Sequence, residues 1–201
     1  MVNEKGKELL TADYDAMVYG NGWFSLLRDG KFGGYQPESG RVLKAVYDAN
    51  LVPLSNQYVM ARKNQKWGLI GPTSKPELVK FQYDEITLLT DSLVLVRSAG
   101  TWDVLDFHTG RKLATAITRW QLVPGAERII FESGGKYGLM GVSAGKVVEP
   151  SYDEITWWSD DNHLLFAGIR KENDDRFVVE YFDRHGLVLR RQTVTANELD
   201  Y

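Results

Sequence analysis

The sequence contains no cysteine among its 201 residues. Disulfide bonds, cysteine nucleophiles and cysteine-ligated zinc sites are therefore excluded, and the redox compartment stays open. No stretch approaches the roughly 18 consecutive apolar residues of a membrane-spanning helix, so we expect no membrane insertion. The first residues lack the apolar core of a signal peptide. We expect a cytoplasmic protein, or a periplasmic or envelope protein if a leader precedes this sequence and is removed.

The sequence also has no excess of basic charge, with 24 lysine and arginine residues against 27 aspartate and glutamate residues. The formal net charge is −3, whereas non-specific nucleic-acid and anionic-membrane binders usually carry a basic surface. We therefore expect no nucleic-acid partner. The acidic excess lies late in the chain and indicates either a docking surface for a basic partner or solvated acidic loops; it comprises Glu149, Asp153, Glu154, Asp160, Asp161, Glu172, Asp174 and Asp175.

Residues that could perform chemistry are few and poorly arranged. The segment Gly141–Gly145 matches the G-x-S-x-G nucleophile motif around Ser143, but a strand-like segment follows it where that motif needs a helix, so we predict a hairpin turn. Metal-ligand spacing is missing for the three histidines, His108, His163 and His185. Aspartates that recur in register read as structural, because a catalytic pair needs unlike environments; these are Asp15, Asp48, Asp84 and Asp153. The sequence thus predicts no enzyme, no cofactor and no metal site.

A repeat of 35 residues is the dominant pattern. The segment KWGLIG (Lys66–Gly71) precedes FQYDEITLL, and KYGLMG (Lys136–Gly141) precedes PSYDEITWW. Aromatic anchors at one constant interval of 35 residues are Phe32, Trp67, Trp102 and Tyr137, and a fifth, Phe177, is displaced by a longer acidic turn. Such self-similarity is typical of repeat architectures.

Each unit is predicted to contain three strands. An apolar run comes first, then a turn rich in glycine and a strand with the aromatic anchor, then a second turn and a strand that ends in Tyr-Asp in four units. Period-two alternation between closely spaced turns predicts antiparallel β-structure and minimal helix. We expect one domain, 1–201, with units near 1–16 (partial), 17–50, 51–86, 87–121, 122–156 and 157–201, and with the anchors buried between successive sheets.

The Lys66-Trp67-Gly68 segment with Tyr83-Asp84 resembles the bacterial WG-repeat (KWG-repeat) family. A second copy, Lys136-Tyr137-Gly138 with Tyr152-Asp153, fits as well, whereas Trp102-Asp103, Phe32-Gly33 and Thr118-Arg119 depart from the pattern. The resemblance implies a β-repeat module of mostly undefined binding function, and it brings no catalytic residues.

Two arrangements of the units are compatible with the sequence. A single meander cannot bury its own apolar face, so consecutive units must pack against one another. We favour a curved or superhelical open stack, because three strands in 35 residues is short for a propeller blade. The alternative is a small closed propeller-like ring.

Differences between copies indicate the binding surface. The segments YDEITLL and YDEITWW differ only in their last two residues, and neighbouring strand residues point to opposite faces, so Trp157 and Trp158 cannot both be buried on one side. Trp120 is also out of pattern; the alternative is that these tryptophans fill a wider gap between units. An exposed Trp beside acidic residues is typical of an interface anchor or a sugar-stacking platform. The predicted partner-binding residues are Trp120, Trp157, Trp158, Asp160, Asp161, Asp174 and Asp175.

We therefore expect a non-enzymatic scaffold that docks a protein partner. One form of this hypothesis is an immunity or inhibitor protein that neutralises a basic toxin, with carboxylates entering a cationic cleft. The alternative is a cell-envelope module that binds glycan or peptidoglycan through its tryptophans.

Overall fold

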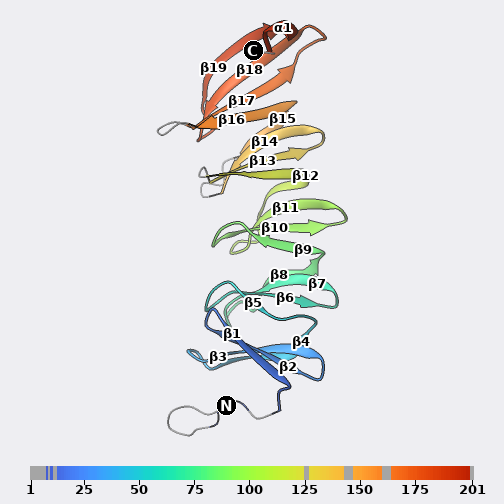
Figure 1. The fold of residues 1–201 in the computed structure, drawn as a ribbon, viewed down its shortest axis with the longest axis vertical. Helices are drawn as coiled ribbons and strands as arrows, with labels where there is room; N and C mark the ends of the chain where they lie inside the picture. The colour runs from blue at the N-terminus through green and yellow to red at the C-terminus, as the bar shows by residue number, and fades with distance from the viewer. Residues whose placement is uncertain are drawn as a thin grey trace. The chain divides into compact units, whose positions relative to one another are not determined.

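A computed structural model describes residues 8, 10, 13–124, 127–142, 147–159 and 164–199. These residues form nineteen strands and one four-residue helix, α1 (Ala196–Leu199) (Figure 1). The expectation of an all-β protein with minimal helix is therefore confirmed.

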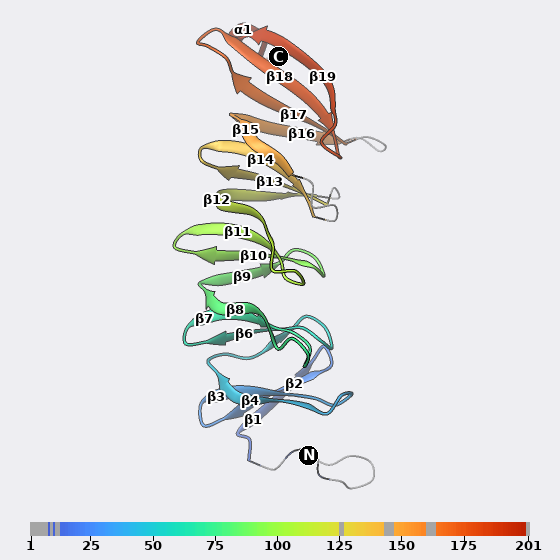
Figure 2. The same ribbon diagram turned by 180° about the vertical axis from the view of Figure 1, so that it is seen from behind.

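The strands form four antiparallel sheets in which strand order follows chain order (Figures 1 and 2). Each described sheet has two end strands, so none is closed. The first sheet contains β1 (Ala16–Gly20), β2 (Trp23–Arg28), β3 (Lys31–Gln36) and β4 (Arg41–Tyr47); the second contains β5 (Val52–Pro53), β6 (Val59–Lys63), β7 (Lys66–Ile70) and β8 (Glu77–Tyr83). The seven-stranded sheet contains β9 (Glu85–Leu88), β10 (Leu93–Ser98), β11 (Thr101–Asp106), β12 (Lys112–Val123), β13 (Arg128–Ser133), β14 (Lys136–Gly141) and β15 (Val147–Tyr152); the C-terminal sheet contains β16 (Glu154–Ser159), β17 (Leu164–Lys171), β18 (Arg176–Asp183) and β19 (Val188–Thr195).

The sequence predicts three strands in each unit, whereas three of the sheets have four strands and the fourth has seven. Short segments downstream of the motif aspartates, β1, β5 and β16, form an additional first strand in the three four-stranded sheets. The aspartate itself redirects the chain, because its N–H donates to a carbonyl of the following hairpin: Asp48 to Arg62 O at 2.7 Å and Asp153 to Ile169 O at 2.8 Å. The chain therefore leaves one sheet and enters the next at this residue.

The exception lies where the Tyr-Asp motif is missing. Thr118-Arg119 occupy that place, and β12 continues through them without interruption for 12 residues. Its first half pairs with β11, as in Trp102↔Ile117, and its second half pairs with β13, as in Val123↔Arg128. Because no aspartate redirects the chain, two groups of strands share β12 and form the seven-stranded sheet.

The motif lysine and the motif aspartate form an ion pair within each regular copy. Lys31 Nζ lies 2.8 Å from Asp48 Oδ1, and the same pairing joins Lys66 to Asp84 and Lys136 to Asp153. The second carboxylate oxygen accepts an N–H from the turn of the following hairpin, Gln65 at 2.7 Å for Asp48 and Lys171 at 2.8 Å for Asp153. Each aspartate thus fastens its own sheet to the next hairpin.

The glycine after the aromatic anchor lies at a β-bulge. The register shifts at Gly33, Gly68 and Gly138 in the pairing of the second motif strand with the third. A Cβ atom at Gly68 would lie 2.8 Å from Val79 O, and one at Gly138 would lie 2.6 Å from Val148 O. The close approach of the neighbouring backbone therefore requires glycine.

The chain divides into two compact units. The first runs to Thr87 and includes Val96–Ala99 and Phe107–Gly110, and the second comprises Leu88–Leu95, Gly100–Asp106 and the chain from Arg111 onward. A core of the first unit joins its two sheets and contains Trp23, Leu51, Val59, Ala61 and Ile70. In the second unit, two clusters form on opposite faces of the β13–β14 hairpin, one around Phe131 and Met140 and the other around Ile130 and Leu139.

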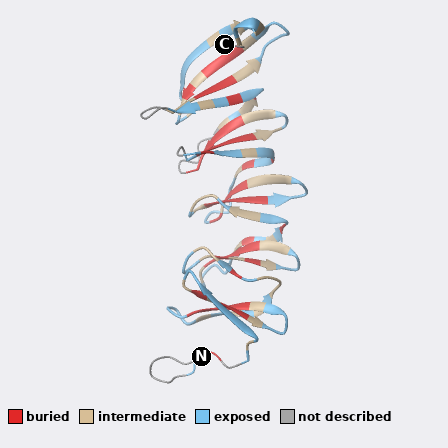
Figure 3. Ribbon diagram, viewed as in Figure 1, coloured by how far each residue is buried: buried red, intermediate tan, exposed pale blue. Residues whose placement is uncertain are grey.

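The five aromatic anchors are half-buried, not fully buried as predicted. Each lies near the start of its strand, one or two residues after a hairpin turn, where the chain is close to solvent. The fully buried positions come two and three residues later, as with Leu69 and Ile70 or Leu139 and Met140. Figure 3 shows the buried residues along the middle of the strands and the exposed ones at the turns.

Candidate functional site

An open groove of about 550 Å³ lies within the second unit, beside the uninterrupted strand β12. Arg119, Trp120 and Gln121 on β12 form one wall. The floor is apolar, because Ile130 and Ile155 are both buried. The remaining lining residues are Tyr137, Asp153 and Glu154. The missing Tyr-Asp motif therefore coincides with the groove.

The polar rim of the groove carries both signs of charge. Arg119 Nε lies 3.4 Å from Glu132 Oε2 across the strand pair. The hydrogen bond from Lys136, followed by that from the Lys171 N–H, holds the pKa of Asp153 below its ordinary value, so this carboxylate stays charged. Glu154 is exposed beside it. The groove can thus offer a carboxylate, a guanidinium and an amide around an apolar floor.

Trp120 is held in place by a second tryptophan. Its ring lies 6.0 Å from that of Trp102, centroid to centroid, at an angle of 78° between the ring planes. Both side chains are half-buried and pack against the cluster that contains Phe131. Edge-to-face packing of this kind favours a fixed ring orientation. The Trp120 ring therefore lies on the Phe131 face of the sheet, opposite the face on which Ile130 and Ile155 form the floor of the groove.

The two adjacent tryptophans point to opposite faces of β16, as the alternation predicts. Trp157 is half-buried and packs on the core cluster that contains Phe166. Trp158 is 44% exposed and lies 6.0 Å from the ring of Tyr181 at 75°. Gln192 Nε2 donates to Tyr181 Oη at 3.1 Å. Trp158 and Tyr181 thus form a small aromatic platform on the outer face of the C-terminal sheet.

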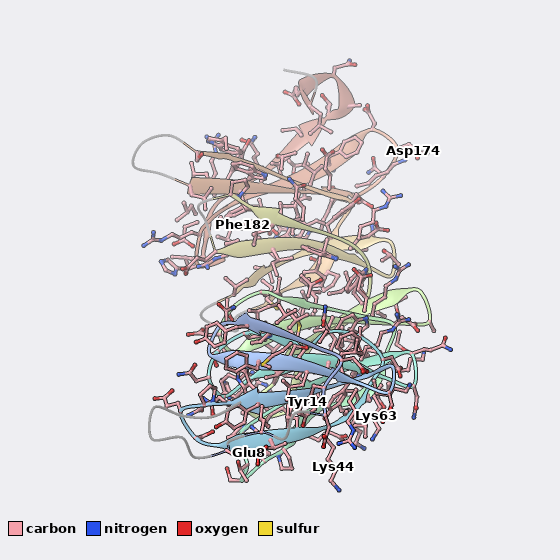
Figure 4. The ribbon with its side chains drawn as sticks, turned by 60° about the horizontal axis from the view of Figure 1, so that its bottom comes forward. Glu8, Tyr14, Lys44, Lys63, Asp174 and Phe182 are labelled. Atoms are coloured by element: carbon pink, nitrogen blue, oxygen red, sulfur yellow. The ribbon has the colours of Figure 1, made fainter. Side chains whose placement is uncertain are left out.

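The predicted acidic residues are partly compensated by neighbouring cations. Asp174 protrudes from the turn between β17 and β18 and pairs with Lys171 at 2.8 Å (Figure 4). Glu172 in the same turn lies 3.5 Å from Arg176. The Asp175 N–H donates to Asn173 Oδ1 at 3.1 Å. Asp160 and Asp161 lie outside the described residues.

The predicted partner-binding residues do not converge on one surface. Trp120 lines the groove, Trp158 lies on the outer face of the C-terminal sheet, and Asp174 lies in a turn. The groove lining includes neither of the adjacent tryptophans. We therefore treat the groove and the aromatic platform as two separate candidate sites.

The two described histidines, His108 and His185, both lie in turns between strands. The His185 ring accepts a hydrogen bond from Arg184 Nε at 3.3 Å and lines a cavity of about 90 Å³ with Arg128. The His108 ring packs on the ring of Phe107, with 4.4 Å between the two ring centroids. Among the described residues, no group of three or more His, Asp or Glu side chains is placed to hold a metal ion. Ser143 and His163 lie outside the described part of the chain.

The sequence patterns did not predict one buried polar network. Glu180 is 8% exposed; its Oε2 accepts a hydrogen bond from Tyr152 Oη at 2.7 Å and lies 3.0 Å from Arg170 NH2. Arg191 Nε lies 3.6 Å from the other oxygen. The signal was present, because Glu180 alternates with the buried Val178 and Phe182 on one face of β18. A charged residue at such a position predicts a buried partner.

Comparisons with known proteins assign neither a family nor a function. No family model matches the chain, and no curated protein matches it. No helix in the described residues is long and apolar enough to cross a membrane.

Several solved structures show distant similarity. Hsv2p from Kluyveromyces lactis is 9% identical over 88% of this chain and 62% of its own, with a TM-score of 0.38. PorZ, a bacterial surface component of the type-IX secretion system of Porphyromonas gingivalis, is 9% identical over 90% of this chain and 28% of its own, with a TM-score of 0.36. The extracellular domain of BT4673 from B. thetaiotaomicron is 10% identical over 90% of this chain and 35% of its own, with a TM-score of 0.37. The chain thus spans about three fifths of the length of Hsv2p.

Proposed function

We propose that this protein is a non-enzymatic scaffold that docks a protein partner in the groove beside Trp120. The observation that carries the proposal is the composition of the groove: a tyrosine, an arginine, an apolar floor and charges of both signs. Interface hot spots combine aromatic and arginine side chains with a dry centre and a polar rim. A volume of about 550 Å³ can admit a protruding side chain or loop of a partner.

Tandem repeat units of the WG-repeat family are the second part of the proposal. The support is the ion pair between motif lysine and motif aspartate, which recurs at Lys31–Asp48, Lys66–Asp84 and Lys136–Asp153. In this proposal the sheets follow one another as an open, curved stack. A crystal structure of the full chain tests it, and a closed ring of sheets would contradict it.

Charge reversal on the rim of the groove tests whether the groove binds the partner. We expect wild-type protein immobilised on beads to retain a stoichiometric protein partner from native lysate. Glu154→Lys, on the exposed rim, should abolish retention. Glu172→Lys, on the exposed turn between β17 and β18, is the matched control and should retain the partner. Equal retention by both variants would move the interface away from the groove, and a wild type that retains no partner would refute the scaffold itself.

Neutralisation of a basic toxin is a special form of this proposal. It relies on free carboxylates in the C-terminal third, yet Asp174 and Glu172 are paired with Lys171 and Arg176. The rim of the groove contributes Glu154 as an exposed acid but also Arg119. A partner with charges of both signs fits this surface better than a uniformly basic one.

A glycan-binding module is the second candidate function. The platform of Trp158 and Tyr181 favours it, because an exposed aromatic ring beside an amide donor suits stacking and hydrogen bonding with a sugar. Titration of the protein with peptidoglycan fragments, followed by tryptophan fluorescence, tests this candidate. A fluorescence change that Trp158→Ala removes and Trp120→Ala preserves is the expected result. An unchanged signal across the panel excludes the module.

A further inference from the structure

Within the described part of the chain, the first strand of the first sheet has an unprotected edge. β1 is an end strand, and within the described residues its single partner in the sheet is β2. All five of its residues are exposed, which Figure 3 shows as a strand without buried segments. Met17, Val18 and Tyr19 are 45%, 59% and 63% exposed. Apolar side chains on both faces of an edge strand therefore meet solvent.

Every other end strand of the four described sheets carries a charged residue or a proline. Natural proteins protect sheet edges in this way, because an open edge presents unpaired N–H and C=O groups to any approaching strand. The protecting residues are Arg41 and Lys44 in β4, Pro53 in β5, Glu77 and Lys80 in β8, Glu85 in β9, Glu149 and Pro150 in β15, Glu154 in β16, and Arg190 and Arg191 in β19. The sequence of β1, AMVYG, contains neither kind of residue.

Hydrogen bonds and a tight turn fix both ends of β1 in an extended conformation. The turn that joins it to β2 has Asn21 at φ 45° and Gly22 at φ 79°, the positive values of a tight hairpin turn. Asn21 Nδ2 donates to Pro53 O at 2.9 Å, which ties the turn to the next sheet of the same unit. At the other end, the Asp15 N–H donates to Leu27 O. An incoming strand would therefore meet an already extended backbone and would not need to order it.

We propose that β1 pairs with β1 of a second copy of this chain, antiparallel and with the two-fold axis through Val18. This register places Val18 opposite the partner's Val18 and Met17 opposite the partner's Tyr19. Asp15 would face the partner's Asn21, so no like charges meet. An isologous contact requires such self-complementarity. A charged peptide, in contrast, would find no counter-charge on this strand.

The expected dimer is weak. Stable interfaces bury about 1,600 Å² in total, and two five-residue strands supply only part of that area. Pairing should therefore be visible at high protein concentration and reversible on dilution. Main-chain hydrogen bonds give the contact its register, and the apolar side chains exclude water from both faces.

Disulfide trapping tests the register directly, because the native chain has no cysteine. Directly opposed residues of an antiparallel pair have Cβ atoms about 4.5–5.5 Å apart, close enough for a disulfide to form with a small adjustment. Val18→Cys should therefore give a covalent dimer under mild oxidation. Val42→Cys, at a valine that is 53% exposed on β4, is the matched control and should remain largely monomeric. An equimolar mixture of Met17→Cys and Tyr19→Cys should cross-link more than either variant alone.

Two further measurements apply to the unmodified protein. Sedimentation of wild-type chain should show a dimer fraction that rises with concentration, and amide exchange in β1 should slow in parallel. Val18→Lys should remove the dimer by placing two cations opposite each other, with unchanged circular dichroism. Equal cross-linking of the cysteine variants at 18 and 42, a dimer that survives Val18→Lys, or a monomer at every concentration would each overturn the proposal. None of these outcomes bears on the groove, whose test uses different residues.

Discussion

Tyr152 donates its hydroxyl hydrogen to Glu180 Oε2 at 2.7 Å, and both side chains are buried. The guanidinium of Arg170 lies over the Tyr152 ring, 5.3 Å from its centroid, and its NH2 is 3.0 Å from the same carboxylate. The Tyr-Asp motif at the end of β15 thus reaches into the C-terminal sheet. A tyrosine that was expected to mark a strand end therefore also holds a buried charge.

Removal of the Tyr152 hydroxyl should destabilise the protein. Tyr152→Phe keeps the ring but leaves Glu180 with one hydrogen-bond donor fewer, which costs about 1.5–3 kcal/mol when the acceptor is charged. Urea denaturation measures the change. Tyr19→Phe, at a ring that is 63% exposed, is the control and should change the free energy of unfolding little. Equal stability of wild type and Tyr152→Phe would show that the network contributes nothing.

The same tyrosine should make stability fall at alkaline pH. Burial, followed by the hydrogen bond to Glu180, raises the pKa of Tyr152 from 10.0 to about 12. A raised folded-state pKa contributes stability that is complete below the unfolded value and is lost as pH rises between the two values. We expect a loss on the order of 2 kcal/mol from about pH 10 to 12. Tyr152→Phe should show a smaller loss over that window.

The motif aspartates should make stability fall at acid pH. A hydrogen bond from the motif lysine, followed by one from a turn amide, lowers the pKa values of Asp84 and Asp153 below the ordinary 3.8. For Asp48 the turn amide is the larger cause and the motif lysine the second. A lowered pKa contributes stability that is present above the unfolded value and is lost as pH falls through the folded value.

Asp153→Asn tests this contribution. The variant should cost about 1 kcal/mol at neutral pH, since its hydrogen bonds lie near the surface. The free energy of unfolding of the variant should also depend less on pH than that of the wild type below about pH 4. Asp175→Asn on the exposed turn serves as the comparison, and a pH profile of Asp153→Asn that coincides with the wild type would argue against the ion pair.

The glycine of the aromatic-glycine motif should not tolerate a methyl group. A Cβ atom at Gly68 would lie 2.8 Å from Val79 O and 2.8 Å from Phe81 Cδ1. Overpacking of this kind costs about 1–3 kcal/mol, so Gly68→Ala should lower the melting temperature. Gly20→Ala is the matched control, because no atom lies within 4 Å of its added Cβ. A similar effect of both substitutions would rule out the close approach as the reason for glycine.

Strain in β12 should be relieved by glycine. Ala116 adopts a left-handed φ of 53°, and its N–H donates to Asp103 Oδ1 at 3.1 Å. The left-handed conformation costs a residue with a side chain roughly 1–2 kcal/mol, so Ala116→Gly should stabilise the protein by up to about 1 kcal/mol. Ala45→Gly in β4 should have the opposite sign. The melting temperatures of the two variants test this prediction. A lower melting temperature for Ala116→Gly than for the wild type would show that the left-handed Ala116 is not strained.

Much of the fold class could be predicted from local patterns. Alternation along strands such as β18, and glycine-rich turns between them, indicated antiparallel β-structure. The count of strands in a sheet was not predictable in the same way. It depends on the exchange of partner strands at Asp48 and Asp153, where the backbone N–H of the aspartate donates to a carbonyl of the following hairpin.

In the candidate sites, too, local patterns predicted some features and tertiary packing decided the others. Alternation required Trp157 and Trp158 to face opposite sides, but only packing against Phe166 decided which one is buried. Trp120 stood out in the sequence, whereas the groove beside it depends on Ile130 and Ile155, which are far from it along the chain.

By itself the sequence determined the local backbone of this protein: extended strands, tight turns and bulges, and a recurring motif of lysine, aromatic, glycine and aspartate. These features depend on neighbouring residues and on steric limits of the backbone, which a single chain segment already contains. Tertiary structure alone decided which strands share a sheet, where Glu180 finds Tyr152, and that β12 forms one wall of a groove. Those outcomes arise from contacts between distant segments, whose free energy no local pattern records.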